Sequence, residues 1–266
     1  MPRPERDQKD AAYAFGDAEL AARRLELVSE VFAPTSRAFL AEVDFRPRLA
    51  LDLGSGPGHT RHLIADTLEP EKTVGIETSA VFLSAARAST QGSGVSFVEH
   101  DATRMPLPLR DPDLVYARFL LSHPPRPAAS VADWVTQPRP GGLLLLEEVE
   151  WIRTEHPVLG ACLEIVEAML ADRGHALYVG PRLNAIGEED GRRRRSSRVD
   201  RPRPSAGQAA RMFSMSLANW RAEPFVRSTY SSETMERVEA GLSELSTSQG
   251  EEEILWGLRQ IVIERT

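Results

Sequence analysis

Three glycines and an aspartate lie close together in the segment ALDLGSGPGHT. Asp52 belongs to a short apolar run, and Gly54, Gly56 and Gly58 follow it at every second position. Glycine lets backbone amides approach a ligand closely, and a carboxylate beside such a turn can accept hydrogen bonds from an ammonium or hydroxyl group. The spacing departs from the dinucleotide fingerprint G-x-G-x-x-G, whose last glycine would fall on His59. The segment therefore predicts a ligand-binding turn of another type.

Short apolar runs alternate with helical patterns around this turn. The apolar runs are LALDLG, TVGIE, VSFVEHD, DLVYAR and GGLLLLEEV, and amphipathic stretches such as VFLSAARAS and SVADWVTQ lie between them. Strands that alternate with helices at this spacing predict a parallel sheet with right-handed crossovers. Ligands of such sheets bind at the carboxyl ends of the strands, where the glycine turn would lie.

The two ends of the chain show other patterns. Apolar residues at helical spacing predict a pair of helices over 17–43, with Asp17 as the N-cap and Pro34 at the start of the second helix. After Glu150, helices are expected at 157–173, 181–189 and 205–247. The Arg-rich stretch RRRRSSRV is extended, and a last strand is expected over 254–265.

ALDLGSGPGHT resembles the first motif of the class I S-adenosylmethionine-dependent methyltransferases. Four later segments resemble that family's motifs in the same order: TVGIET, VSFVEHDATRMPLP, DLVYARFLLSH and RPGGLLLLEEV. The resemblance implies that S-adenosylmethionine is the cofactor. It implies that Glu77 accepts hydrogen bonds from the ribose hydroxyls, that Asp101 with Ala102 reads the adenine, and that Asp52 faces the cofactor ammonium. The cofactor-binding residues expected in full are Tyr13, Asp52, Gly54, Ser55, Gly56, Gly58, Glu77, Thr78, Asp101, Ala102, Arg118 and Phe119.

The resemblance also implies the fold. We expect an α/β, Rossmann-like sheet of seven mostly parallel strands with helices on both faces. The last strand, 254–265, would be inserted antiparallel between the fifth strand and the Arg-rich sixth strand at the sheet edge. A single domain over 1–266 would comprise an N-terminal helical lid at 1–47, a cofactor-binding core at 48–150, and acceptor-side insertions with the last two strands at 151–266.

The N-terminal segment has two interpretations. Tyr13 and the following run from Glu19 to Leu25 resemble the helical lid of many small-molecule methyltransferases, and a lid would close over the cofactor and exclude water. Alternatively, these helices only cover the sheet. The inserted helices would complete the acceptor pocket, with apolar and aromatic candidates that could equally be core: Trp151, Tyr178, Met212, Phe213, Met215 and Trp220.

Three residues are candidates for acid–base catalysis. His123 follows the fourth strand, where a neutral imidazole could take a proton from a substrate hydroxyl. His156 and Glu150 lie near the end of the fifth strand and are second choices. Each could instead have a structural role, and methyl transfer by proximity alone, without a base, is also open. His175 and the remaining histidines are interpreted as structural or solvent-facing.

Composition limits the partners. The formal net charge of -7 disfavours a generic nucleic-acid or membrane-surface binder. The arginines between Arg192 and Arg203 would suit phosphate, but no aromatic residue interleaves the run, and charge on an edge strand opposes aggregation. The single cysteine, Cys162, excludes an internal disulfide, and no apolar run approaches the ~20 residues that span a bilayer. We expect a cytoplasmic protein with a small-molecule acceptor and no metal, either monomeric or homodimeric.

The function indicated is methyl transfer to an oxygen or nitrogen of a small organic molecule, in keeping with secondary metabolism. A protein or RNA methyltransferase is an alternative, and so is a cofactor-binding protein without transfer activity. Helical insertions that enclose a pocket would favour the small-molecule function.

Overall fold

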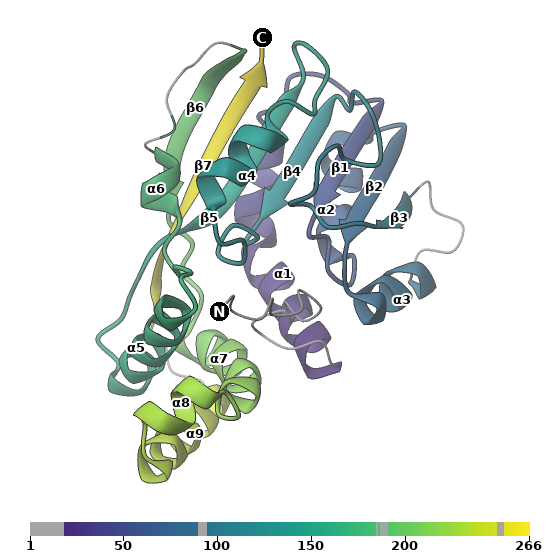
Figure 1. Ribbon diagram of the computed structural model, residues 1–266. Coiled ribbons are helices and arrows are strands. Elements are labelled where there is room, and N and C mark those ends of the chain that lie inside the picture. The colour runs from purple at the N-terminus through teal and green to yellow at the C-terminus, as the bar shows by residue number, and fades with distance from the viewer. Residues whose placement is uncertain (1–18, 90–94, 185, 187–190, 249–252) are drawn as a thin grey trace, which may run out of the picture.

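The computed structural model describes residues 19–89, 95–184, 186, 191–248 and 253–266 (Figure 1). Within these residues, seven strands form one sheet in the order β3-β2-β1-β4-β5-β7-β6. The strands are β1 (Leu49–Leu53), β2 (Lys72–Glu77), β3 (Val95–Glu99), β4 (Leu114–Arg118), β5 (Leu143–Arg153), β6 (Arg192–Asp200) and β7 (Leu255–Arg265). Strands β1 to β5 are parallel, and β7 is antiparallel to both of its neighbours, β5 and β6. The Rossmann-like fold, the inserted last strand and the Arg-rich edge strand are thereby confirmed.

Nine helices accompany the sheet in the described residues. They are α1 (Glu19–Leu40), α2 (His59–Leu68), α3 (Ala80–Ala88), α4 (Pro127–Trp134), α5 (Pro157–Asp172), α6 (Gly180–Asn184), α7 (Ala206–Trp220), α8 (Pro224–Thr229) and α9 (Ser232–Thr247). None of these helices is long and apolar enough to cross a lipid bilayer, as far as the described part of the chain extends.

Apolar side chains on both faces of the central strands bury the sheet between two layers. Alternate residues of β1 point to opposite faces, so Ala50 packs with α1 and α2 while Leu51 packs with α4 and α6. Strands buried on both faces read as continuous apolar runs, which is why LALDL and LLLL were recognisable in the sequence.

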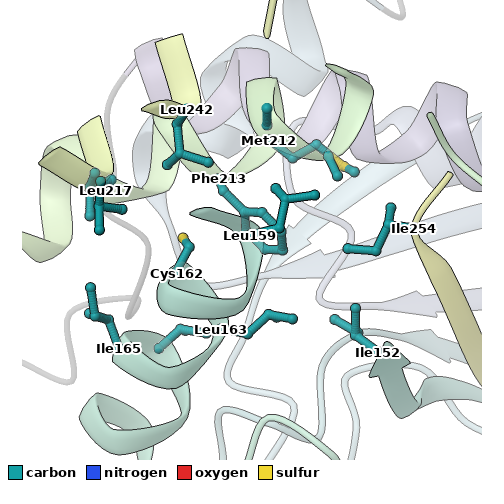
Figure 2. Close-up of a cluster of buried hydrophobic side chains, with 14 of the residues drawn as sticks. Ile152, Leu159, Cys162, Leu163, Ile165, Met212, Phe213, Leu217, Leu242 and Ile254 are labelled. Carbon is teal, nitrogen blue, oxygen red and sulfur yellow. The ribbon is translucent and has the colours of Figure 1, made fainter. Parts of the chain in front are cut away.

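A second helical layer lies beyond one end of the sheet, where Figure 1 shows α5, α7, α8 and α9 together. Their core is a buried cluster in which side chains of α5 point toward α7 and α9 (Figure 2). Cys162 belongs to this cluster, and burial raises the pKa of its thiol to about 12, as expected of an inert core cysteine. The long strands β5 and β7 extend toward this layer and connect it to the sheet.

The N-terminal pair of helices is the main error of the sequence prediction. Residues 19–40 form the single helix α1, with Pro34 in its interior. Proline removes one backbone donor, but Phe32, Ser36 and Phe39 on either side are buried against the sheet, and this packing outweighs the local cost. Asp17 lies outside the described residues. Of the helix expected at 181–189, the structure describes α6 over Gly180–Asn184, and residues 185 and 187–190 lie outside the described residues. The division into lid, core and insertions stays a prediction.

Candidate functional site

The glycine turn between β1 and α2 requires its glycines. Gly54, Gly56 and Gly58 have φ angles of +64°, +53° and +93°, in the left-handed region that side chains rarely adopt. A Cβ atom on Gly54 would also lie 2.7 Å from Cδ1 of Leu120. The turn therefore exposes backbone rather than side chains at the carboxyl end of β1.

Glu77 connects the end of β2 to this turn. Its Oε2 accepts the amide N–H of Gly56 at 2.8 Å, and its Oε1 accepts those of Thr78 and Ser79 at 2.8 and 2.9 Å. A carboxylate oxygen has two acceptor positions, so Oε2 keeps one for a further donor. The geometry thus fits one ribose hydroxyl at Glu77.

Asp52 carries a buried oxygen without a partner. Its side chain is 1% exposed, and Oδ2 accepts no hydrogen bond from any residue that the structure describes. Burial raises its pKa to about 7, although the positive charge of Arg118 acts in the opposite direction. A nearby cation would stabilise the carboxylate, so this orphaned oxygen fits the ammonium group of S-adenosylmethionine.

The turn after β3 presents Asp101 and Ala102. Asp101 Oδ1 accepts the amide N–H of Thr103 at 2.8 Å, and Oδ2 lies 3.5 Å from Nε of Arg104. The indole N–H of Trp134 donates to the carbonyl of Ala102 at 2.7 Å and fixes the turn against α4. Asp101 remains partly exposed, as an acceptor for an exocyclic amine should be.

These turns surround one cavity of about 940 Å³. The expected cofactor-binding residues that line it are Gly54, Ser55, Gly56, Glu77, Thr78, Asp101, Ala102, Arg118 and Phe119. Asp52 and Gly58 are not among the lining residues, and Tyr13 lies outside the described residues. The structure therefore brings together the end of β1, β2, β3 and β4, as the sequence predicted.

Among the three catalytic candidates, only His123 lines the cavity. Its side chain is partly buried, and burial lowers its pKa to about 4, with Arg24 and His175 contributing in the same direction. The imidazole is neutral at pH 7 but is a weak base.

The other two candidates face elsewhere. Glu150 forms an ion pair with Arg259, which donates from Nη2 to Oε1 at 2.6 Å and from Nε to Oε2 at 2.9 Å. His156 is the N-cap residue of α5, outside the cavity lining, and its buried Nδ1 has no partner in the described part of the chain. Both positions favour a structural role over a catalytic one for Glu150 and His156.

Among the lining residues that the sequence reasoning did not select, Glu148 and His175 have pKa values shifted by burial. Burial raises the pKa of Glu148 to about 8, against the effect of backbone hydrogen bonds from Leu121 and Leu120. The signal for Glu148 was the acidic pair that interrupts the apolar run LLLLEEV. His175 follows α5 in a loop, and no local pattern marks its approach to the cavity.

Arg118 connects the cavity to α1. Its guanidinium donates to Oγ of Ser36 at 3.0 Å and to Oγ of Ser29 at 3.4 Å. Ser36 in turn donates to Oε1 of the fully buried Glu147 at 2.8 Å. This network ties the N-terminal helix to β4 and β5.

The far end of the cavity is apolar and aromatic. Phe32 of α1 packs against Phe119 with ring centroids 5.4 Å apart and against Trp256 at 5.0 Å. Among the six pocket candidates, Met212, Phe213 and Trp220 line the cavity, whereas Trp151, Tyr178 and Met215 do not. This apolar half of the cavity is lined by side chains of α1 and of α7 in the helical layer beyond the sheet.

The Arg-rich strand β6 is paired within the fold. Arg193 and Arg195 both donate to Oε2 of Glu264 on β7, and Arg198 pairs with Glu42 and donates to Gln260. These bonds support the edge-strand interpretation over a phosphate-binding surface.

Comparisons with known proteins identify similar proteins among methyltransferases. Residues 51–146 match the family model of a methyltransferase domain. Trans-aconitate 2-methyltransferase of Methylobacterium radiotolerans is 37% identical over 101 residues, which are 38% of this chain and 38% of that protein. An uncharacterized 37.1 kDa protein in a Streptomyces fradiae transposon is 34% identical over 116 residues, 42% of this chain and 33% of that protein. The matches thus span little more than a third of the curated relatives' length.

Solved structures share the fold over most of the chain. A Bacillus halodurans protein assigned as a methyltransferase has a TM-score of 0.55 at 18% identity, covering 87% of this chain and 98% of its own. The plantazolicin methyltransferase in complex with a substrate analogue and S-adenosylhomocysteine has a TM-score of 0.53 at 15% identity, covering 93% and 88%. Residues 51–146 thus match a methyltransferase domain, and the solved structures share the Rossmann-like fold over most of the chain.

Proposed function

We propose that the chain transfers a methyl group from S-adenosylmethionine to an oxygen or nitrogen of a small organic molecule. The observation that supports this proposal is a cavity of about 940 Å³ that has polar groups in one half and apolar side chains in the other. The volume is near the upper end of about 300–1,000 Å³ for small-molecule sites, which leaves room for a cofactor and an acceptor. When bound, the cofactor supplies an electrophilic methyl group on a sulfonium.

The polar half has the donors and acceptors to hold the cofactor. Asp52 would bind the ammonium, Glu77 a ribose hydroxyl and Asp101 the adenine amine. Gly54, Gly56 and Gly58 keep side chains out of the turn, so the backbone can approach the aminoacyl end. Each role matches an acceptor atom that is unpartnered or still has an open position.

The apolar half would hold the acceptor. Phe213, Trp220 and Trp256 provide aromatic walls, and His123 brings a neutral imidazole to the same cavity. His123 would accept a hydrogen bond from the acceptor hydroxyl or amine and orient its lone pair. With a pKa of about 4, it suits orientation better than full proton removal, so alignment supplies most of the rate.

A concave cavity, lined in its apolar half by side chains of α1, α5 and α7, supports a small-molecule acceptor over a protein or RNA. The paired arginines of β6 are consistent with an enzyme that does not bind nucleic acid. A cytoplasmic location, a place in secondary metabolism and either a monomeric or a homodimeric state complete the proposal.

Two measurements test this function. Calorimetry should show binding of S-adenosylhomocysteine, and release of S-adenosylhomocysteine from S-adenosylmethionine should depend on a member of a panel of hydroxylated and aminated aromatic compounds. Phe213→Ala should raise the KM of that acceptor and leave cofactor affinity unchanged, because Phe213 lies in the apolar half. Turnover with RNA or protein, and with no member of the small-molecule panel, would contradict the proposal.

A further inference from the structure

The turn after β4 adopts a strained conformation beside the cavity. Phe119 has a φ angle of +53°, although it carries a side chain. Bulky residues rarely occupy this region, and such strain persists only where the surrounding structure imposes it. The contacts that impose it here come from β5.

Three hydrogen bonds hold residues 119–121 in place. The amide of Phe119 donates to the carbonyl of Glu147 at 2.9 Å, and the amides of Leu120 and Leu121 both donate to Oε1 of Glu148 at 2.7 Å. Glu148 is 1% exposed, so one buried side-chain oxygen anchors two consecutive amides. Burying a carboxyl group is costly, and its retention here is explained by these two bonds.

The anchored turn contacts both halves of the site. Leu120 lies over the glycine turn, with its Cδ1 only 2.7 Å from where a Gly54 Cβ would be. Phe119 lines the cavity and packs edge to face against Phe32 of α1. A shift of the turn would therefore remove the side chain that supports Gly54 and move one wall of the cavity.

We propose that Glu148 is a positioning residue of the cofactor site, which sets cofactor affinity by anchoring the 119–121 turn against the glycine turn. Glu148 acts through the amides of Leu120 and Leu121 and the side chain of Leu120. The proposal requires cofactor binding at this site but not methyl transfer to any particular acceptor.

The test compares Glu148→Leu with Glu148→Gln, using S-adenosylhomocysteine as the probe in calorimetry. Leucine cannot accept either N–H, so the Kd should rise by about tenfold or more, the scale of one to two lost hydrogen bonds. The carbonyl oxygen of glutamine can accept both, so its Kd should stay within about threefold of the wild type. Amide hydrogen exchange should quicken at Leu120 and Leu121 in the leucine variant and stay slow in the glutamine variant.

Glu150→Gln is the matched control. It alters a largely buried carboxyl on the same strand, whose ion pair with Arg259 lies outside the cavity lining. This variant should lower the melting temperature and leave the Kd for S-adenosylhomocysteine unchanged.

Leu120→Ala tests whether the side chain of Leu120 transmits the effect of Glu148 to the glycine turn. It also tests the proposal if Glu148→Leu does not fold. It removes the side chain over Gly54 but keeps both bonds to Glu148, so affinity should fall while exchange at Leu121 stays slow. Wild-type affinity in a folded Glu148→Leu protein, or in Leu120→Ala, would overturn the proposal. A wild-type protein that does not bind S-adenosylhomocysteine would instead overturn the proposed function.

Discussion

Gly56 donates its amide N–H to Oε2 of Glu77 at 2.8 Å, which joins the glycine turn after β1 to the end of β2. Glu77 thereby shapes the turn and also keeps an acceptor position for the cofactor. Glu77→Ala should weaken S-adenosylmethionine binding by about 1.5–3 kcal/mol, the range for hydrogen bonds to a charged group. Calorimetry measures the change, with Glu77→Gln as a control that keeps one acceptor oxygen. Unchanged affinity in a folded Glu77→Ala protein would remove Glu77 from the site.

Asp52 should make stability depend on pH in a defined direction. Its pKa is about 7 in the folded chain and 3.8 by reference, so between these values the folded state retains a proton that the unfolded state has lost. The free energy of unfolding therefore falls as pH rises through this window. Asp52→Asn should flatten the fall, which urea unfolding at about pH 5, 6 and 7 would show. The raised pKa of Glu148, about 8, makes stability fall with pH in the same direction. The contribution of Asp52 is therefore the difference between the pH slopes of the wild type and of Asp52→Asn.

Cofactor binding should oppose this loss of stability. If Asp52 faces the ammonium, saturating S-adenosylhomocysteine should make the pH dependence shallower in the wild type and have little such effect in Asp52→Asn. Equal slopes for the two proteins without the cofactor would contradict the assigned pKa shift.

His123→Ala should slow methyl transfer and leave the affinity for S-adenosylhomocysteine unchanged. A loss of about 10²–10⁴-fold is the scale of proton transfer, and a smaller loss is expected if His123 only orients the acceptor. Because the pKa of His123 is about 4, the rate should show no histidine-dependent decline between about pH 8 and pH 5. A wild-type rate in this variant would exclude His123 from the reaction.

Ser36→Ala should destabilise the attachment of α1 to the sheet. Ser36 donates to Glu147 and accepts from Arg118, so its loss leaves the buried carboxyl of Glu147 and the half-buried guanidinium of Arg118 each with one partner fewer. We expect a decrease of about 1–3 kcal/mol in the free energy of unfolding. Ser29→Ala is the control, because its bond to Arg118 is longer, 3.4 Å, and its loss should matter less. Equal effects of the two substitutions would contradict a central role for Ser36.

The parts of the site that the sequence predicted depend on local chemistry. A left-handed turn at Gly54, Gly56 and Gly58 can be built only from residues that tolerate positive φ, so the glycines themselves mark it. Glu77 and Asp101 lie directly after apolar strands, and parallel strands bring such positions to one edge of the sheet. The order of these segments along the chain was therefore sufficient to predict that their residues lie close together at one edge of the sheet.

The parts that the sequence did not predict depend on packing between distant elements. Pro34 was interpreted as a helix start, but buried neighbours on both sides keep α1 continuous. Glu148 and Glu150 are the same residue type two positions apart on β5. Nevertheless, Glu150 pairs with Arg259, whereas Glu148 lines the cavity. Trp151 and Trp220 were equal candidates for the pocket in the sequence. The arrangement of α7 places Trp220, and not Trp151, in the cavity lining. Such choices are made by tertiary contacts that no short segment encodes.

The position of β7 between β5 and β6 makes the attachment of the edge strand depend on the last strand of the chain. β6 pairs with β7 and not with β5, and three helices separate β6 from β7 along the chain. In the described sheet β6 therefore has β7 as its one neighbouring strand, and on its free edge the four consecutive arginines, Arg192–Arg195, would repel a similarly charged copy. Glu264 of β7 binds Arg193 and Arg195 together. The native neighbouring strand thus supplies the carboxylate that compensates two charges of the edge strand, whereas a second copy of β6 would add only like charge.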